Sequence, residues 1–234
     1  MNNKILVPLD INYGNAITGL GEITDNIVSF FKKPKDFKLV LFTGGEDVSP
    51  TWYGETSPKR MCGSNLNRDH IEMRIFKHAV HNNIKIAGIC RGMQLINVMA
   101  GGRMFHHVSN HAGSVHNIQV ANGKILEVNS LHHQMCILNH HNTVLVGWAK
   151  PSISKIYYSD KDEQTNFNGL EAEIIITPKQ NACGVQYHPE IMGKQTYGYK
   201  FFYEFIKNFL KTDINKFTIN YTNKKELKLN ANSN

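Results

Sequence analysis

The chain has 234 residues, of which 41% are hydrophobic and 19% charged, so it can bury a sizeable core and disorder is excluded as its main state. No apolar run approaches the roughly 18 residues that cross a bilayer, so we expect no membrane association. The net charge of +7 comes from scattered lysines without a long basic run. This pattern leaves room for an anionic small molecule, and we expect no nucleic acid partner.

Strands and helices alternate in the first half of the chain. Short apolar runs predict buried strands at Lys4–Leu9, Lys38–Phe42 and Ile84–Ile89. Apolar residues at helical spacing predict helices at Ile17–Phe31, Asp69–His81 and Gly92–Met99. Asp69 is the predicted N-cap of the second helix, with Glu72 three residues on. The stretch from Pro50 to Arg68 is rich in Pro, Gly, Ser and Asn and is predicted to be a loop.

The second half is predicted to be richer in strands. The candidates are Val115–Val120, Ile125–Val128, Val144–Ala149, Ile153–Tyr158, Glu173–Thr177 and Ala182–Tyr187. A helix is predicted at Tyr197–Leu210, followed by a polar, loosely held tail over about residues 211–234. We therefore expect one α/β domain over residues 1–234, with a mostly parallel sheet covered on both faces and extended by antiparallel strands.

The cysteines show no paired spacing that would suggest a zinc site or a disulfide framework. They are Cys62, Cys90, Cys136 and Cys183. The N-terminus lacks a long apolar core followed by a cleavage site, so secretion is not expected. These two observations predict a cytoplasmic protein.

The most informative segment is Gly88-Ile-Cys-Arg-Gly92, which follows a predicted buried strand and opens a predicted helix. This is the arrangement of a nucleophile elbow, with Cys90 in the place of serine. The flanking glycines permit a sharp turn, and a helix N-terminus favours the thiolate form of a cysteine. The backbone N–H of Arg91 is placed to stabilise an oxyanion formed beside Cys90.

A nucleophilic cysteine needs a base, and the base needs an orienting group. His188 follows a predicted strand and is separated from Glu190 by a single proline. Proline fixes φ, so the two side chains are expected to lie on one rigid turn where Glu190 orients the imidazole.

A His-rich stretch raises the question of a metal, since it contains His106, His107, His111 and His116. The spacing of His107 and His111 suggests a pair of ligands, but no Cys or carboxylate stands in register with them. We therefore expect neither a metal nor a cofactor.

Several further motifs follow one another in the order found in a known family. They are residues 43–50 (TGGEDVSP), 68–72 (RDHIE), 88–94 (GICRGMQ), 95–102 (LINVMAGG), 128–134 (VNSLHHQ) and 185–190 (VQYHPE). Together they resemble the class I glutamine amidotransferase-like superfamily, and within it the peptidase C26 branch of γ-glutamyl hydrolases. The resemblance spans roughly residues 38–210 and implies a flavodoxin-like three-layer sandwich that hydrolyses γ-glutamyl amides.

The resemblance also implies roles for individual residues. Cys90 would be the nucleophile, His188 the base and Glu190 its partner. The oxyanion hole would be formed by the backbone N–H of Arg91 and that of Gly44 or Gly45. The glutamyl group would be bound by Gln94 and by the segment that contains Asn129, Ser130, His132, His133 and Gln134.

Within this branch the whole sequence looks most similar to hydrolases of γ-glutamyl-CDP-amidate, which act in bacterial capsule phosphoramidate biosynthesis. The implied substrate is a nucleotide-linked γ-glutamyl compound. The loop after the oxyanion turn carries candidate residues for stacking a base and binding phosphates: Trp52, Tyr53, Lys59, Arg60 and Arg68. Another γ-glutamyl amide, such as γ-glutamyl-aminobutyrate, and a glutaminase subunit remain alternatives. A C26-like enzyme can also form a homodimer.

Overall fold

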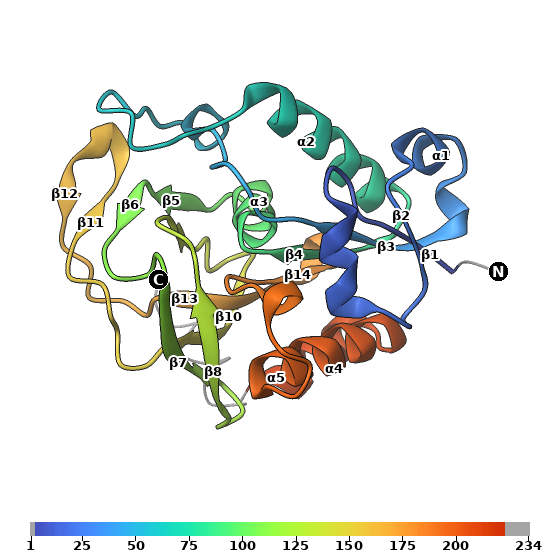
Figure 1. Ribbon diagram of the computed structural model, residues 1–234. Coiled ribbons are helices and arrows are strands. Elements are labelled where there is room, and N and C mark those ends of the chain that lie inside the picture. Colours follow the sequence, from blue (N-terminus) through green and yellow to red (C-terminus); the bar gives the residue numbers. More distant parts are fainter. Residues whose placement is uncertain (1–2, 223–234) are drawn as a thin grey trace.

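A nine-stranded sheet runs through the centre of the computed structural model, which describes residues 3–222 (Figure 1). In spatial order the strands are β2 (Glu22–Thr24), β1 (Lys4–Leu6), β3 (Phe37–Phe42), β4 (Lys85–Ile89), β14 (Ala182–Val185), β13 (Ala172–Thr177), β10 (Val144–Ala149), β7 (Ser114–Val120) and β8 (Ile125–Ser130). Neighbours from β2 to β14 pair in parallel, and those from β14 to β8 pair antiparallel. The prediction of a parallel sheet with antiparallel additions is confirmed.

Helices cover both faces of this sheet. The helices α1 (Ile27–Lys32), α2 (Leu66–His81) and α3 (Arg91–Met99) lie on one face, and α4 (Tyr197–Lys211) and α5 (Ile214–Tyr221) lie on the other (Figure 1). The result is the three-layer flavodoxin-like sandwich that the sequence predicted.

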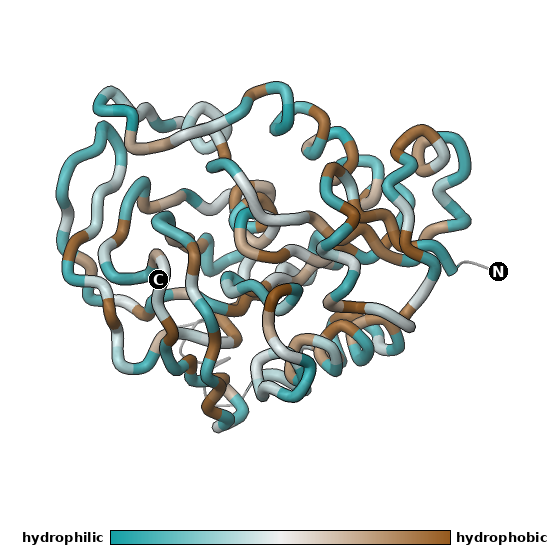
Figure 2. The backbone as a smooth tube through the Cα atoms, viewed as in Figure 1, coloured by the Kyte–Doolittle hydropathy of each residue, from teal (hydrophilic) through white to brown (hydrophobic). Residues whose placement is uncertain are grey.

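The central strands bury side chains on both faces. Along β3, Leu39 and Leu41 join the core beneath α4, whereas Val40 and Phe42 join the core beneath α2 and α3. Successive strand residues point to opposite faces, so a strand covered on both sides is apolar throughout. Figure 2 shows the hydrophobic stretches gathered in these central strands.

Smaller sheets and short helices border the main sheet. One small sheet contains β12 (Gln164–Thr165), β11 (Tyr157–Tyr158) and β6 (His107–Val108), and another contains β5 (Arg103–Phe105) and β9 (Met135–Ile137). The 3₁₀ helices are η1 (Ile11–Ile17), η2 (Pro34–Asp36), η3 (Pro50–Tyr53), η4 (Asp160–Asp162), η5 (Pro178–Gln180) and η6 (Pro189–Ile191). A separate apolar cluster supports the small sheets, with Phe105 and Tyr157 at its centre.

The predicted helix over Ile17–Phe31 is wrong. This stretch contains the end of η1, the strand β2 and only then α1, which starts after the N-cap Asn26. Gly19 has φ of 88°, which ends the first helix, and a side chain at Gly21 would meet the carbonyl oxygen of Asn3 at 2.6 Å. The glycines therefore break the segment and let it pair closely beside β1.

The start of α2 also differs from the prediction. The helix begins at Leu66, and the side chain of Asn65 caps it by accepting the backbone N–H of Arg68. Asp69 is therefore not the N-cap; it lies inside the helix, fully buried. Asn65 takes the capping role upstream, and the carboxylate of Asp69 pairs with Arg91 instead.

Three strand predictions were too long. The chain is extended only over Lys4–Leu6 at the N-terminus, Tyr157–Tyr158 in place of Ile153–Tyr158, and Ala182–Val185 near the C-terminus. The tail prediction is wrong over α5, because Phe217 of this helix is completely buried against α4. The remainder of the predicted tail, residues 223–234, lies outside the described residues. Across residues 3–222 we find no helix with the length and apolarity needed to span a bilayer.

Candidate active site

Cys90 stands at the sharp junction between β4 and α3. Its backbone has φ of 52° and ψ of −108°, a conformation that side-chain-bearing residues adopt rarely. The Cys90 N–H donates to the carbonyl oxygen of Val185 at 2.8 Å, which ties the turn to the neighbouring strand β14. Such local strain is found at functional sites, where the surrounding structure maintains it.

Two glycines allow this junction to form. A side chain at Gly88 would lie 2.3 Å from the carbonyl carbon of Gly92, and one at Gly92 would lie 2.4 Å from the carbonyl oxygen of Phe42. These distances are shorter than any tolerated contact. The strand and the helix therefore approach closely only because both positions lack a Cβ.

His188 and Glu190 lie directly after β14, the parallel neighbour of β4. Because parallel strands end at the same edge of a sheet, His188 lies beside Cys90. The Nδ1 of His188 is 2.6 Å from Oε1 of Glu190, which fixes the imidazole orientation. Burial alone would lower the pKa of His188, but its hydrogen bonds and charge interactions with Cys90 and Glu190 raise it to about 10.

Asn129 at the end of β8 holds the backbone of His188. Its side-chain Nδ2 donates to the His188 carbonyl oxygen at 3.0 Å, and its Oδ1 accepts the His188 N–H at 2.9 Å. The sequence predicted Asn129 as a substrate contact. The structure instead places it in a two-hydrogen-bond clamp on the candidate base, where it positions His188.

The Gly44–Gly45 turn is held from outside by Arg68. One guanidinium nitrogen of Arg68 donates to the Gly44 carbonyl oxygen at 2.6 Å and to Thr43 Oγ1 at 3.1 Å. The same side chain pairs with Glu46 at 2.6 Å and with Glu72 at 3.2 Å. Gly45 has φ of 129°, and a Cβ there would overlap the Arg68 guanidinium.

A buried charge network continues from Arg68 beneath α3. The guanidinium of Arg91 is 1% exposed and pairs with Asp69 and Glu72, both of which are fully buried. Glu72 therefore connects Arg68, which holds the glycine turn, with Arg91, which follows the candidate nucleophile. Neither the side chain of Arg91 nor Asp69 was predicted to have this role, because the pairing joins residues about twenty positions apart.

A pocket of about 230 Å³ opens beside the candidate nucleophile. Its lining residues are Gly45, Glu46, Asp47, Gly63, Cys90, Gln94, Leu131, His132, His133 and Gln134. A larger depression of about 510 Å³ is lined by residues such as Tyr197 and Tyr221 and contains neither Cys90 nor His188.

Most of the predicted substrate residues lie in or under this pocket. Gln94 is oriented by its Nε2, which donates to Gln186 Oε1 at 3.3 Å and to the Gln134 carbonyl oxygen at 3.4 Å. His133 is 3.1 Å from Asp47, and this hydrogen bond raises the pKa of His133. Ser130, by contrast, is fully buried and does not line the pocket.

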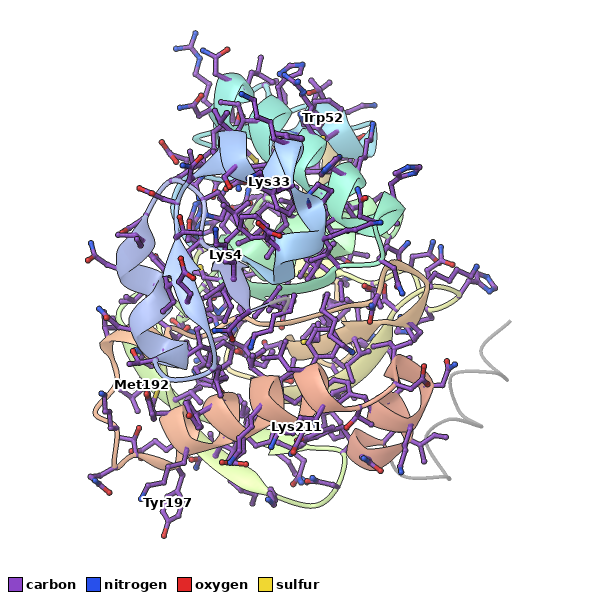
Figure 3. All side chains as sticks on the ribbon, turned by 90° about the vertical axis from the view of Figure 1, so that its right-hand side faces the viewer. Lys4, Lys33, Trp52, Met192, Tyr197 and Lys211 are labelled. Carbon is purple, nitrogen blue, oxygen red and sulfur yellow. The ribbon has the colours of Figure 1, made fainter. Side chains whose placement is uncertain are left out.

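Three of the five predicted nucleotide-side residues are engaged within the protein, and the other two are exposed. Trp52 and Tyr53 pack against the core beneath α2, and Figure 3 places Trp52 at the α2 end of the molecule. Arg68 is committed to the glycine turn and its acidic partners. Lys59 and Arg60 are exposed, although the Lys59 ammonium donates to the carbonyl oxygen of Asp162 at 3.1 Å. Of the five residues, Lys59 and Arg60 are thus the two exposed cations, and neither lines the pocket.

The loop that carries Lys59 and Arg60 is fastened to η4. Asp162 accepts the backbone N–H of Lys59 at 2.6 Å and the hydroxyl of Ser57 at 2.8 Å. His106 lies fully buried between Glu55 and Asp162, at 2.9 Å from each carboxylate. Through these contacts His106, a member of the His-rich stretch, joins Glu55 to Asp162 of η4.

Tyr13, which belongs to η1, lies at the site although no sequence motif indicated it. Its ring centroid is 6.2 Å from that of His188, and a Cβ on Gly44 would lie 2.5 Å from its hydroxyl oxygen. Burial, together with the charge of Glu190, raises the pKa of Tyr13. The N-terminal segment matched the family motifs poorly, so no pattern pointed to this residue.

Comparison with protein families identifies one match. The Peptidase C26 model matches residues 34–190. The glutamine amidotransferase-like protein YvdE of Lactococcus lactis is 40% identical over 82 residues, which cover 35% of this chain and 34% of that protein. The match therefore spans about a third of that relative's length. A provisionally named glutamine amidotransferase of Schizosaccharomyces pombe is 30% identical over 197 residues, covering 74% of this chain and 70% of that protein.

Solved structures share the fold at low sequence identity. A glutamine amidotransferase from Thermotoga maritima has a TM-score of 0.51 and 14% identity, with 98% of this chain and 94% of that chain covered. A protein from Thermoplasma acidophilum, provisionally described as part of a GMP synthase, has a TM-score of 0.59 and 14% identity, with 98% of both chains covered. At this identity the likeness concerns the fold alone.

Proposed function

The chain belongs to the Peptidase C26 family of the class I glutamine amidotransferase-like superfamily, and from this membership we propose a cysteine-dependent hydrolase of γ-glutamyl amides. The single observation that carries the proposal is the placement of Cys90, on a strained strand–helix junction, beside the His188–Glu190 pair. Family membership supports hydrolysis of an amide bond, and the site supplies a nucleophile, a base and its orienting carboxylate.

The reaction begins with an ion pair. With its raised pKa, His188 holds a proton in the resting site, which favours the thiolate form of Cys90. The thiolate attacks the γ-carbonyl carbon and forms a tetrahedral oxyanion. His188 then donates its proton to the leaving nitrogen as the carbon–nitrogen bond breaks. A water molecule, deprotonated by His188, hydrolyses the γ-glutamyl thioester and releases glutamate.

The oxyanion would be held by the backbone N–H groups of Arg91 and Gly45. Arg68 fixes the orientation of the glycine turn, because its guanidinium binds the Gly44 carbonyl oxygen at 2.6 Å. In a trans peptide the N–H of Gly45 points away from that carbonyl, and Gly45 is the glycine that lines the pocket with Cys90. Each such donor contributes roughly 3–4 kcal/mol of transition-state stabilisation.

The charges in the pocket support a glutamyl substrate. Glu46 and Asp47 contribute carboxylates that suit an α-ammonium group, and His133 beside Asp47 adds a cationic or hydrogen-bonding partner. In this proposal the pocket of about 230 Å³ receives the glutamyl moiety, and the leaving group would lie across its rim, near Gly63.

For the leaving group we propose cytidine diphosphoramidate, so that the substrate is γ-glutamyl-CDP-amidate. The similarity of the whole sequence to such hydrolases supports this choice, as do the exposed cations Lys59 and Arg60, which shortly precede Gly63 in the sequence. The names of the relatives favour a second candidate, in which the site hydrolyses glutamine for an amidotransferase.

The deciding experiment measures glutamate release by the purified chain from γ-glutamyl-CDP-amidate, γ-glutamyl-aminobutyrate and L-glutamine. We expect turnover of the nucleotide compound that is lost in Cys90→Ala. Substitution of Lys59 and Arg60 by glutamine should raise KM for this substrate and leave that for γ-glutamyl-aminobutyrate unchanged. Preferred turnover of glutamine would favour the amidotransferase role, and activity that survives in Cys90→Ala would refute the cysteine mechanism.

A further inference from the structure

A buried cluster of histidine and glutamate side chains lies beneath the pocket, outside the proposed reaction. It comprises His111, His116, His132, Glu171 and Glu173, all of them buried. One ligand atom from each of His111, His132 and Glu173 lies within 4.8 Å of the others. The carboxylate comes from β13, whereas the two histidines come from the segments that flank β7 and β8, so the group converges only in the folded chain.

Contacts on the outer side of the two imidazoles orient them toward the centre. The Nδ1–H of His132 donates to the Gln134 carbonyl oxygen at 2.8 Å, so in the neutral ring Nε2 keeps its lone pair. The Nε2 of His111 lies 3.3 Å from the Glu171 carboxylate without forming a hydrogen bond, and its Nδ1 faces Glu173. Imidazoles that bind metals show the pattern of His132, since the second nitrogen donates to a carbonyl or carboxylate oxygen.

Two of the inward-facing atoms lack hydrogen-bond partners: the Nε2 of His132 and Oε2 of Glu173 are both buried without one in the described structure. Oε1 of Glu173 is 3.1 Å from His116 Nε2, and His111 Nδ1 is 3.5 Å from the hydroxyl of Ser130. Oε1 of Glu173 also lies 3.7 Å from His132 Nε2 and 3.7 Å from His111 Nδ1. These separations are too long for hydrogen bonds, but they match the roughly 3–4 Å between neighbouring ligands of a metal bound at about 2.0–2.2 Å.

The cluster also brings two acidic side chains into the interior. Glu171 lies 3.3 Å from His111, and Glu173 lies 3.1 Å from His116 and keeps one carboxylate oxygen without a partner. A buried carboxylate is strongly unfavourable unless a cation or hydrogen-bond donors compensate it, and a bound divalent ion would supply that compensation.

We propose that His111, His132 and Glu173 form a binding site for one divalent transition-metal ion, with Zn²⁺ the expected occupant. Two imidazole nitrogens and one carboxylate are a donor set that zinc favours. Because all three side chains are buried, we expect the ion to stabilise the fold and not to take part in the reaction. The ion would brace His132 from below and thereby hold the 131–134 segment that lines the pocket.

No metal was expected from the sequence, because no carboxylate stands in register with the His-rich stretch. Of the three proposed ligands only His111 belongs to that stretch; Glu173 on β13 comes about forty residues after His132 and about sixty after His111, so spacing alone could not indicate the site. The proposal does not depend on the hydrolase reaction.

The test uses tag-free full-length protein carrying Cys90→Ala, so that no active-site thiolate competes for metal. After treatment with a chelator, the protein is titrated with Zn²⁺ and, separately, with Co²⁺. We expect one ion per chain, a rise in Tm of roughly 5–10 °C at a hundredfold excess over Kd, and cobalt d–d absorption without a thiolate charge-transfer band.

Two variants in the same background locate the ion. Glu173→Gln should weaken Zn²⁺ binding at least tenfold, whereas His141→Ala, at an exposed histidine outside the cluster, should leave it unchanged. No binding and no shift in Tm in the Cys90→Ala protein would refute the site and assign the cluster to proton sharing. The titration of the Cys90→Ala protein tests the proposed metal site even if Glu173→Gln fails to fold. Unchanged Zn²⁺ stoichiometry and affinity in a folded Glu173→Gln protein would also refute the site.

Discussion

Backbone conformation and surroundings separate Cys90 from the other three cysteines. Cys90 has a positive φ and lines the pocket, whereas Cys136 and Cys183 are buried in apolar surroundings that raise the pKa of each thiol. Burial also raises the pKa of Cys62, to about 11. Of these four thiols, that of Cys90 lies beside the imidazole of His188, whose pKa is raised, so we expect the four thiols to differ in reactivity.

Brief treatment with iodoacetamide at pH 7 should therefore modify Cys90 first. The thiolate is the reactive form, and the other three thiols remain protonated at that pH. Peptide mapping by mass spectrometry would check the order of modification, with Cys90→Ala as the control. Faster labelling of Cys62, the half-buried thiol, would contradict the proposed ion pair.

Glu190→Gln should change the pH dependence of turnover. The pKa of His188 is raised to about 10, so its proton is present below that pH and is lost as the pH rises through it. Removing the Glu190 charge lowers this pKa, and the descending limb of kcat/KM should move about one unit or more toward acid. A limb that stays in place would show that Glu190 does not act on His188.

Arg68→Lys should lower kcat by roughly 10- to 1000-fold with a smaller change in KM, because a lysine cannot hold both the Gly44 carbonyl and Glu72. Arg74→Gln, on the exposed side of the same helix, is the matched control. Steady-state kinetics with a γ-glutamyl substrate measure the effect. A proportional rise in KM with unchanged kcat would assign Arg68 to substrate binding instead of oxyanion positioning.

At the scale of elements, the sequence predicted best where one local rule decides the structure. The run Lys85–Ile89 followed by Gly-x-Cys-x-Gly predicted both the strand and the junction that places Cys90. The helix prediction over Ile17–Phe31 failed because the apolar spacing favoured a helix. In the structure Gly19 has a positive φ that ends η1, and Gly21 packs closely against the backbone of Asn3 beside β1. Pairings between distant elements, such as Arg91 with Asp69, leave no local pattern and could not be predicted.

The helix α5 illustrates the same point, since a polar stretch contains one essential apolar residue. Phe217→Ala should destabilise the fold by about 3–5 kcal/mol, because the ring is fully buried between Phe205 and Phe209. Ile219→Ala, 55% exposed on the same helix, should change stability by less than about 0.5 kcal/mol. Urea unfolding would measure both, and equal effects would contradict the packing of α5.

For the whole molecule, the relevant property is its charge. The chain carries a net charge of +7, and the proposed substrate is a dianionic or more highly charged nucleotide. A positive field increases the rate at which such a substrate meets its site, and salt screens that field.

We therefore expect kcat/KM for γ-glutamyl-CDP-amidate to fall severalfold between about 0.01 and 0.15 M salt, over which the Debye length shortens from about 30 to 8 Å. The same salt change should barely alter kcat/KM for γ-glutamyl-aminobutyrate, which has no phosphate. Initial rates at low substrate concentration check both. Equal salt dependence for the two compounds would argue against electrostatic attraction of the nucleotide.

The order of strands in the sheet has a consequence for protein synthesis. Cys90 and His188 follow neighbouring strands, yet the ribosome makes the proposed base roughly a hundred residues after the proposed nucleophile, a delay of about 5–20 s at ordinary elongation rates. During that interval β4 lacks the partner strand that brings the imidazole to the thiol. The proposed ion pair therefore forms only after β14 has been made and paired with β4.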